Sequence, residues 1–160
     1  MIQAETDAGL QNPEPRQCSG PADGGEPCNR ARVLITDDDE TVLRLFEMLI
    51  RSEVPGIVVD TAHNGAEAYA SFLRGHHAVL VLDLNMPILD GRQTFVRIQG
   101  LCRDRGWEMP AVVFCTGYSP PDAVRRAVRG DRSHALLVKP VAADDIVQAV
   151  RNRLFRPSDS

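Results

Sequence analysis

Residues 78–91 read AVLVLDLNMPILDG, in which a continuous apolar run is followed at once by a carboxylate, Asp83. A run of this kind is typical of a parallel strand that is buried on both faces, and it is the most apolar run in the chain. A carboxylate at the end of such a strand is costly unless it is used. The stretch therefore predicts the central strand of a sheet, with Asp83 as a functional residue at its carboxyl end.

Three other apolar runs end in the same way, and a fourth, Ile57 to Ala62, reads as a further strand. The three stops are VLIT (33–36) at Asp37 and Asp38, AVVFC (111–115) at Thr116, and ALLV (135–138) at Lys139. The carboxyl ends of parallel strands share one edge of a sheet. We therefore expect three acids, a hydroxyl and an ammonium to converge there.

Apolar residues recur at helical spacing between these runs. The predicted inward residues are Val42, Leu45, Phe46, Leu49 and Ile50 in the first helix, Ala66, Tyr69, Ala70 and Leu73 in the second, which Gly75 ends, and Phe95, Ile98, Leu101 and Cys102 in the third. Ser119 is expected to cap a fourth helix that carries Pro120 and Pro121 in its first turn, and the fifth spans Asp144 to Arg156. Five strands alternating with five helices predict an α/β fold with a doubly wound parallel sheet in the order 2-1-3-4-5, in which strands 1 and 3 flank the crevice.

The composition limits the domain count and the class of protein. With 160 residues and 43% hydrophobic content, the chain can form one good core. We expect residues 1–30, rich in proline and glycine, to be a disordered tail containing Cys18 and Cys28, residues 31–156 to form the domain, and residues 157–160 to be a short tail. The net charge of −4 argues against nucleic-acid binding through bulk charge, and the lack of any membrane-length apolar stretch predicts a cytoplasmic protein.

The predicted convergence of acids implies a particular chemistry. Two carboxylates about 4 Å apart repel by roughly 4 kcal/mol at an effective dielectric of 20, so the cluster needs a cation. An all-oxygen ligand set suits Mg²⁺ better than zinc. Thr116 offers a hydroxyl and Lys139 a compact cation for phosphoryl oxygens. Together these groups indicate phosphoryl transfer to a carboxylate.

These motifs resemble the receiver domain of two-component response regulators, which has a flavodoxin-like fold. The stretches that carry the resemblance are VLITDDDETVLRLF (33–46), VLVLDLNMPILDG (79–91), VVFCTGYS (112–119) and LLVKP (136–140). The resemblance implies that Asp83 takes a phosphoryl group from a phosphohistidine on a sensor histidine kinase or histidine phosphotransfer protein. It also implies that Asp38 and Asp83 ligate Mg²⁺ directly, that Asp37 acts through a bound water and that Asn85 contributes its backbone carbonyl.

The resemblance implies further that Thr116 bonds the phosphoryl group, that Lys139 pairs with it on the opposite side, and that the Lys139–Pro140 bond is cis. One residue departs from the family pattern, because Leu136 stands where an aromatic residue usually reports phosphorylation to the output surface. Asp39 is expected to cap the first helix. The four histidines, His63, His76, His77 and His134, are expected to be solvated.

Several functions remain open at this point. The leading hypothesis is a stand-alone receiver, not an enzyme acting on other substrates, that binds an unknown downstream protein or works in a phosphorelay. The alternatives are a receiver cut from a hybrid histidine kinase, an aspartyl-phosphate phosphohydrolase, and a dinucleotide-binding fold, which would need a glycine-rich turn where Asp37 to Asp39 stand. We expect no nucleic-acid module after the last helix, and therefore no direct contact with nucleic acid. Arg125, Arg126 and Arg129 share a helix side, which suits an acidic partner or a solvated face.

Overall fold

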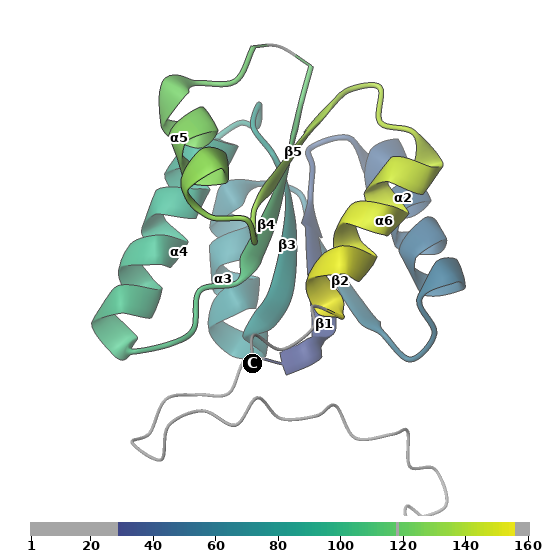
Figure 1. Cartoon of the computed structure of the whole chain (residues 1–160), viewed down its shortest axis with the longest axis horizontal. Helices are drawn as coiled ribbons and strands as arrows, with labels where there is room; N and C mark the ends of the chain where they lie inside the picture. Colours follow the sequence, from purple (N-terminus) through teal and green to yellow (C-terminus); the bar gives the residue numbers. More distant parts are fainter. Residues whose placement is uncertain (1–28, 118, 156–160) are drawn as a thin grey trace, which may run out of the picture.

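The computed structural model describes residues 29–117 and 119–155, in which five strands alternate with five helices (Figure 1). The strands are β1 (Asn29–Thr36), β2 (Val58–Ala62), β3 (His77–Asp83), β4 (Ala111–Thr116) and β5 (Ala135–Val138). The helices are α2 (Glu40–Glu53), α3 (Gly65–Gly75), α4 (Gly91–Arg105), α5 (Asp122–Gly130) and α6 (Ala143–Leu154). In this part of the chain, no helix combines the length and the apolar character that crossing a membrane requires.

The strands form one parallel sheet in the order β2-β1-β3-β4-β5, as the sequence predicts. The register places Val33 beside Val79 and Val79 beside Ala111, so the three central strands run in step. The winding reverses between β1 and β3. The carboxyl ends of these two strands therefore lie next to each other at one edge of the sheet.

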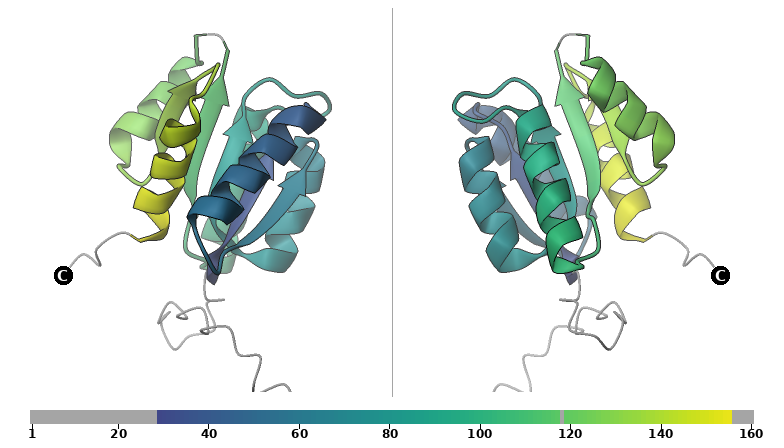
Figure 2. Two further views of the ribbon diagram at one scale, coloured as in Figure 1. Left: turned by 90° about the vertical axis from the view of Figure 1, so that its right-hand side faces the viewer. Right: turned by 90° about the vertical axis from the view of Figure 1, so that its left-hand side faces the viewer.

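Helices cover both faces of the sheet, with α2 and α6 on one side and α3, α4 and α5 on the other (Figures 1 and 2). Alternate residues of β3 point to opposite faces, so Val79 and Val81 join the core under α2 and α6, whereas Leu80 and Leu82 join the other core. All four of these side chains are buried. The burial explains why β3 reads as a continuous apolar run and confirms that it is a central strand.

Two helices are rotated relative to the faces that the sequence predicts. In α2, Leu43, Phe46 and Ile50 are buried, whereas Leu45 is 45% exposed. In α3, the buried side chains include Ala68 and Phe72. None of the four residues predicted to point inward is buried: Ala66, Tyr69, Ala70 and Leu73. Residues two apart on a helix differ by about 200° in direction, so a face centred on Leu43 turns Leu45 toward solvent.

The ends of three helices also test the sequence-based expectations. Asp39 caps α2 as predicted, because its carboxylate accepts a hydrogen bond from the Thr41 N–H at 2.9 Å. The expectation for α5 was wrong, since the helix begins at Asp122 with Pro121 as its cap and without a side-chain cap bond. A proline disfavours helical backbone in the residue before it. Pro120 therefore restricts Ser119, and Pro121 restricts Pro120, so neither position joins the first turn of α5. At the end of α3, His76 rather than Gly75 takes the left-handed conformation, with φ of 47°.

Two of the four histidines are buried, so the expectation of solvated imidazoles was wrong for them. His77 is 1% exposed, and its Nε2 lies 2.7 Å from a carboxylate oxygen of Asp60. His134 is buried, and its Nδ1 accepts a hydrogen bond from the Val112 N–H at 3.1 Å. Each of these buried imidazoles has a polar partner from another strand, which makes its burial less costly, although Nδ1 of His77 has no hydrogen-bond partner among the described residues.

The domain boundaries differ slightly from the predicted ones. β1 begins at Asn29, two residues inside the segment expected to be a tail, and α6 ends at Leu154. The predictions for residues 1–28, with Cys18 and Cys28, and for residues 157–160 lie outside the described residues. Cys102 and Cys115 are buried free thiols within the core, as expected.

Candidate functional site

Three carboxylates meet where β1 and β3 end. Asp37 directly follows β1, and Asp83 is the last residue of the neighbouring strand β3. One carboxylate oxygen from each of Asp37, Asp38 and Asp83 lies within 4.8 Å of the others. Asp37 is 2% exposed and Asp83 is 3% exposed, whereas Asp38 faces solvent. The predicted convergence of acids at this edge is therefore present.

Backbone amides fix the two buried carboxylates. The Asp37 N–H donates to the carbonyl of Ala62 at 3.2 Å, which extends the pairing of β1 with β2 past the strand end. Asp37 Oδ1 accepts from the N–H of Asp39 at 2.9 Å, and Asp83 Oδ1 accepts from the N–H of Asn85 at 3.1 Å. Each carboxylate thus binds the amide two residues further on, a local pattern that orients aspartates at strand ends.

Lys139 brings a positive charge to the two buried acids. Its Nζ lies 2.9 Å from Asp37 Oδ2 and 3.4 Å from Asp83 Oδ1. The residue follows β5, which is separated from β3 by β4, so the long side chain must reach across the end of β4. The backbone N–H of Lys139 donates to the carbonyl of Thr116 at 2.7 Å, which holds the start of this loop against β4. The Lys139–Pro140 bond is cis, as the family resemblance implied.

Thr116 is the last residue of β4 and lies at the same edge. Its neighbour Cys115 is the register partner of Asp83, and the Leu84 N–H donates to the Cys115 carbonyl at 3.0 Å. The side chain of Thr116 is buried. β4 therefore ends in a buried threonine next to the strand end that carries Asp83.

The electrostatics of the cluster follow from burial and from the neighbouring charges. Burial, together with the negative charge of Asp37, raises the pKa of Asp83 to about 6, although the Asn85 N–H and the Lys139 ammonium oppose the rise. Burial alone would lower the pKa of Lys139. The hydrogen bond to Asp37 and the two carboxylate charges outweigh that effect and raise it. At neutral pH the site therefore holds an ionised Asp83 at a cost, beside a firmly protonated lysine.

The loop after Asp83 is shaped by a close approach and by a strained turn. A side chain on Gly91 would collide with the carbonyl oxygen of Asp83 and with the Cα of Leu84. The sequence alone gives no sign of this contact, since a glycine after the capping residue Asp90 is also an ordinary helix start. Ile88 has φ of 70° and is 80% exposed, and the N–H of Leu89 donates to the carbonyl of Pro87 across it at 2.7 Å.

The donor set fits a hard divalent cation. Asp37, Asp38 and Asp83 offer carboxylate oxygens only, and among the described residues no histidine or thiolate belongs to the cluster. Three negative charges face one lysine, which leaves excess negative charge for a cation to balance. Oxygen ligands with room for water suit Mg²⁺ or a similar ion.

Comparison with known proteins relates this geometry to a protein family. The family model that describes the response regulator receiver domain matches residues 33–151 of this chain. Transcriptional regulatory protein PrrA of Mycobacterium tuberculosis is 34% identical over 125 residues, and transcriptional regulatory protein GlrR of Escherichia coli is 35% identical over 124 residues. Each match covers 78% of this chain but only 50% of PrrA and 26% of GlrR. The chain therefore spans about half the length of the first relative and about a quarter of the second.

Solved structures show the same fold. A response regulator receiver domain protein from Clostridium thermocellum is 27% identical, with a TM-score of 0.64, and the match covers 78% of this chain and 94% of that chain. A CheY-like receiver domain protein from Methanospirillum hungatei has the same TM-score at 22% identity, over 77% of this chain and 92% of that chain. At this lower identity the likeness bears on the fold alone.

Proposed function

Because this chain belongs to the response regulator receiver domain family, we propose that Asp83 accepts a phosphoryl group from a phosphohistidine of a sensor histidine kinase or histidine phosphotransfer protein. The observation that carries the proposal is the position of Asp83. It is a buried carboxylate at the end of the central strand, within reach of two other acids and a lysine ammonium. Buried carboxylates with a shifted pKa are concentrated at functional sites in proteins, which supports a reactive role for Asp83.

The reaction would form a bond between a carboxylate oxygen of Asp83 and phosphorus, while the bond from phosphorus to the donor imidazole breaks. Asp83 must be ionised to attack, and with a pKa raised to about 6 it is mainly ionised at neutral pH. The raised pKa also makes it a better nucleophile than an ordinary aspartate would be. The Lys139 ammonium, 3.4 Å from Asp83 Oδ1, would stabilise the negative charge that arrives on the phosphoryl oxygens.

A magnesium ion would complete the site. Asp37, Asp38, Asp83 and the backbone carbonyl of Asn85 are the groups that we propose to hold it, and the ion would supply positive charge that screens the acids from the incoming phosphoryl group. Thr116, at the end of β4, would donate its hydroxyl to a phosphoryl oxygen after transfer. Lys139 would bind the phosphoryl group from the side of β5.

The phosphohydrolase alternative is disfavoured by Asp39. Such an enzyme needs a second acid two residues after its nucleophile, and Asp39 stands at that spacing after Asp37. The carboxylate of Asp39 instead caps α2 by accepting the Thr41 N–H at 2.9 Å, on the exposed side of the helix start. We therefore propose no catalysis beyond the gain and loss of the phosphoryl group of this domain itself.

The output of the phosphorylated domain would be protein binding. We propose that residues 31–156 act as a cytoplasmic receiver that contacts a downstream protein or passes the phosphoryl group along a relay, without itself binding nucleic acid. All helices and strands of the described residues belong to the one sheet fold. Leu136 on β5 is half-buried and cannot report phosphorylation as a rotating aromatic ring does. The output would therefore differ from that of receivers that carry the ring.

Incubation with acetyl phosphate and Mg²⁺, followed by intact mass spectrometry, tests the proposal. We expect the gain of one phosphoryl group, its loss in Asp83→Asn and after chelation of the metal, and its retention in Asp104→Asn, which changes an exposed aspartate far along α4. Phosphorylation of Asp83→Asn to the same extent as the wild type would refute the assignment.

A further inference from the structure

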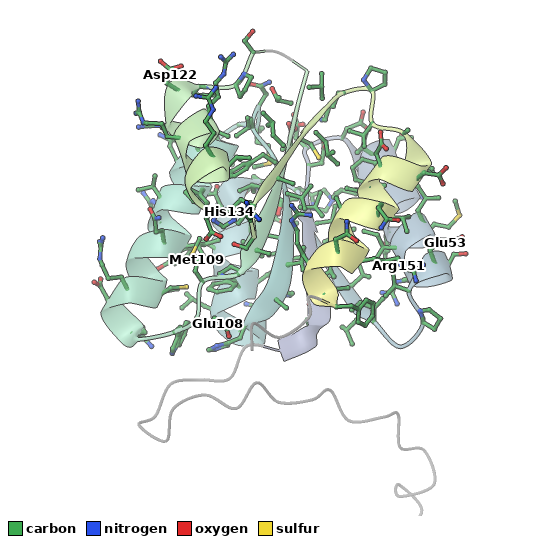
Figure 3. The ribbon with its side chains drawn as sticks, in the orientation of Figure 1. Glu53, Glu108, Met109, Asp122, His134 and Arg151 are labelled. Carbon is green, nitrogen blue, oxygen red and sulfur yellow. The ribbon has the colours of Figure 1, made fainter. Side chains whose placement is uncertain are left out.

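A groove lies between the carboxyl ends of α4 and α5, and it is separate from the acidic site. It has a volume of about 460 Å³, and its apolar lining includes Phe95, Trp107, Met109 and Ala127. These side chains are buried or half-buried, whereas Arg103 and Arg126, which also line it, are exposed. Met109 and His134, both labelled in Figure 3, come just before β4 and β5, so this side of the groove lies at the amino-terminal ends of these strands, whereas the acids follow the carboxyl ends of β1 and β3.

The two helices that form the groove are strongly basic. Together α4 and α5 carry seven arginines against Asp104 and Asp122, a net charge of +5, although the whole chain has a net charge of −4. Asp131 is the acid that lines the groove, and its Oδ1 already accepts from the N–H and the hydroxyl of Ser133 at 2.8 and 2.6 Å. The groove therefore presents an apolar surface flanked by positive charge.

The wall of the groove beside β5 is firmly built. The imidazole of His134 is fixed by the Val112 N–H and packs edge-on against Phe95 at 5.4 Å between ring centres. The guanidinium of Arg153 donates to the carbonyls of Ser133 and His134 at 2.8 and 3.1 Å. A wall held by this many contacts keeps its shape, and a preformed groove binds a segment at lower entropic cost.

We propose that residues 5–14 of this chain bind in the groove between α4 and α5. The segment reads ETDAGLQNPE, with three carboxylates, no cation and one large apolar side chain, Leu10. Residues 1–28 carry five acids and one arginine, so the whole negative excess of the chain lies in this part of it. The carboxylates of Glu5, Asp7 and Glu14 match the arginines on the two sides of the groove, and Leu10 matches its apolar lining.

The position of the first strand makes the contact possible. β1 begins at Asn29 at the amino-terminal edge of the sheet, the same edge at which this side of the groove lies. β1 and β4 are separated by β3, about 10 Å across the sheet, and the helix layer adds about 10 Å. The residues from Leu10 to Asn29 can span up to about 60 Å. The segment therefore reaches the groove with length to spare.

Trp107 provides the measurement, because it is the single tryptophan of the chain and lines the groove. We expect acrylamide to quench its fluorescence weakly in the full chain at low salt and more strongly in a variant carrying Glu5→Gln, Asp7→Asn and Glu14→Gln. An exposed ion pair changes a binding equilibrium by about twofold to fivefold, so the triple variant should weaken docking by about tenfold or more. High salt should bring the wild type to the same value.

Matched controls locate the contact. Asp23→Asn with Glu26→Gln removes two charges from the same end of the chain, outside residues 5–14, and should leave the quenching unchanged. Arg103→Gln with Arg126→Gln should raise it, and the amide resonances of Ala127 and Gly130 should move in the same variants that change the fluorescence. Equal quenching in the wild type and the triple variant overturns the proposal. Protection that increases with protein concentration also overturns it, since a second copy would then occupy the groove.

Discussion

Replacing Asp83 with asparagine should stabilise the metal-free protein at neutral pH. The pKa of Asp83 is raised from 3.8 to about 6, chiefly by burial, so the folded state holds its negative charge unfavourably. One pKa unit corresponds to about 1.4 kcal/mol, which gives about 3 kcal/mol as the largest gain from removing this charge. This figure already includes the attraction of Lys139 for the ionised carboxylate, and asparagine keeps an oxygen that can accept the Asn85 N–H.

The gain should depend on pH with a definite sign. Above pH 6, Asp83 is ionised in both the folded and the unfolded wild type, and the cost of its burial is complete. As the pH falls from 6 toward 3.8, the folded state binds a proton before the unfolded state does, so the wild type becomes more stable relative to the variant. Below 3.8 the carboxyl is protonated in both states, and the difference between the two proteins disappears.

Urea unfolding followed by circular dichroism, with chelator present and at several pH values, measures this difference. Asp104→Asn serves as the control and should change the free energy of unfolding by less than about 0.5 kcal/mol, since that carboxylate is exposed. Saturating Mg²⁺ should stabilise the wild type much more than Asp83→Asn, because a ligand stabilises the state that binds it. A variant less stable than the wild type at pH 8, or a gain independent of pH, would contradict this account of the buried charge.

The remaining predictions concern four other positions. Gly91→Ala should destabilise the protein by about 2 kcal/mol or more in urea unfolding, since its Cβ would meet the Asp83 carbonyl. Gly100→Ala serves as the matched control, because its Cβ would meet only the far end of Arg103 at 3.8 Å, and it should stabilise the protein by about 0.5–1 kcal/mol. Lys139→Met should cost about 2 kcal/mol in chelator by leaving two buried acids without their cation, and added Mg²⁺ should offset part of the loss, as thermal melts can show. Burial lowers the pKa of His77, against the hydrogen bond to Asp60, so stability should fall as the pH drops below 6.5, where the unfolded chain is the first to bind the proton. His77→Gln, which cannot be protonated, should show a weaker fall, and an unchanged profile would exclude His77 as the cause.

The strand ends were predictable from the sequence because their pattern is local. The apolar runs before Asp83 and Asp37 each mark a buried strand and its end without any knowledge of partners. The run before Lys139 marks β5, an edge strand whose residues are half-buried or exposed. The topological rules for parallel sheets then place those ends at one edge. The convergence of the acids and the lysine follows from these two steps, and the observed distances agree with it.

The faces of the helices and the burial of the histidines depend on contacts that a local pattern does not contain. Leu43 and Leu45 are the same residue type, and only the packing of α2 against the sheet decides which one is buried. The burial of His77 depends on Asp60, which lies on β2, two places away in the sheet, and forms a hydrogen bond with the imidazole. The imidazole of His134 is likewise held by Val112, a residue of β4. The start of α5 was mistaken because consecutive prolines were taken as helix formers instead of as residues that restrict their predecessors.

Ile88 introduces backbone strain into the loop that follows Asp83. A β-branched residue with φ of 70° lies outside its preferred backbone conformations, at a cost of about 1–3 kcal/mol, and its exposed side chain gains nothing from the core. The turn persists because Leu89 on its far side is buried and its carbonyl accepts the N–H of Gly65 from α3 at 3.2 Å. The strand end that carries Asp83 is thus connected to α3 through a strained turn that two contacts hold, the burial of Leu89 and the hydrogen bond to Gly65. Loss of either contact would make it easier for the turn to relax to another conformation.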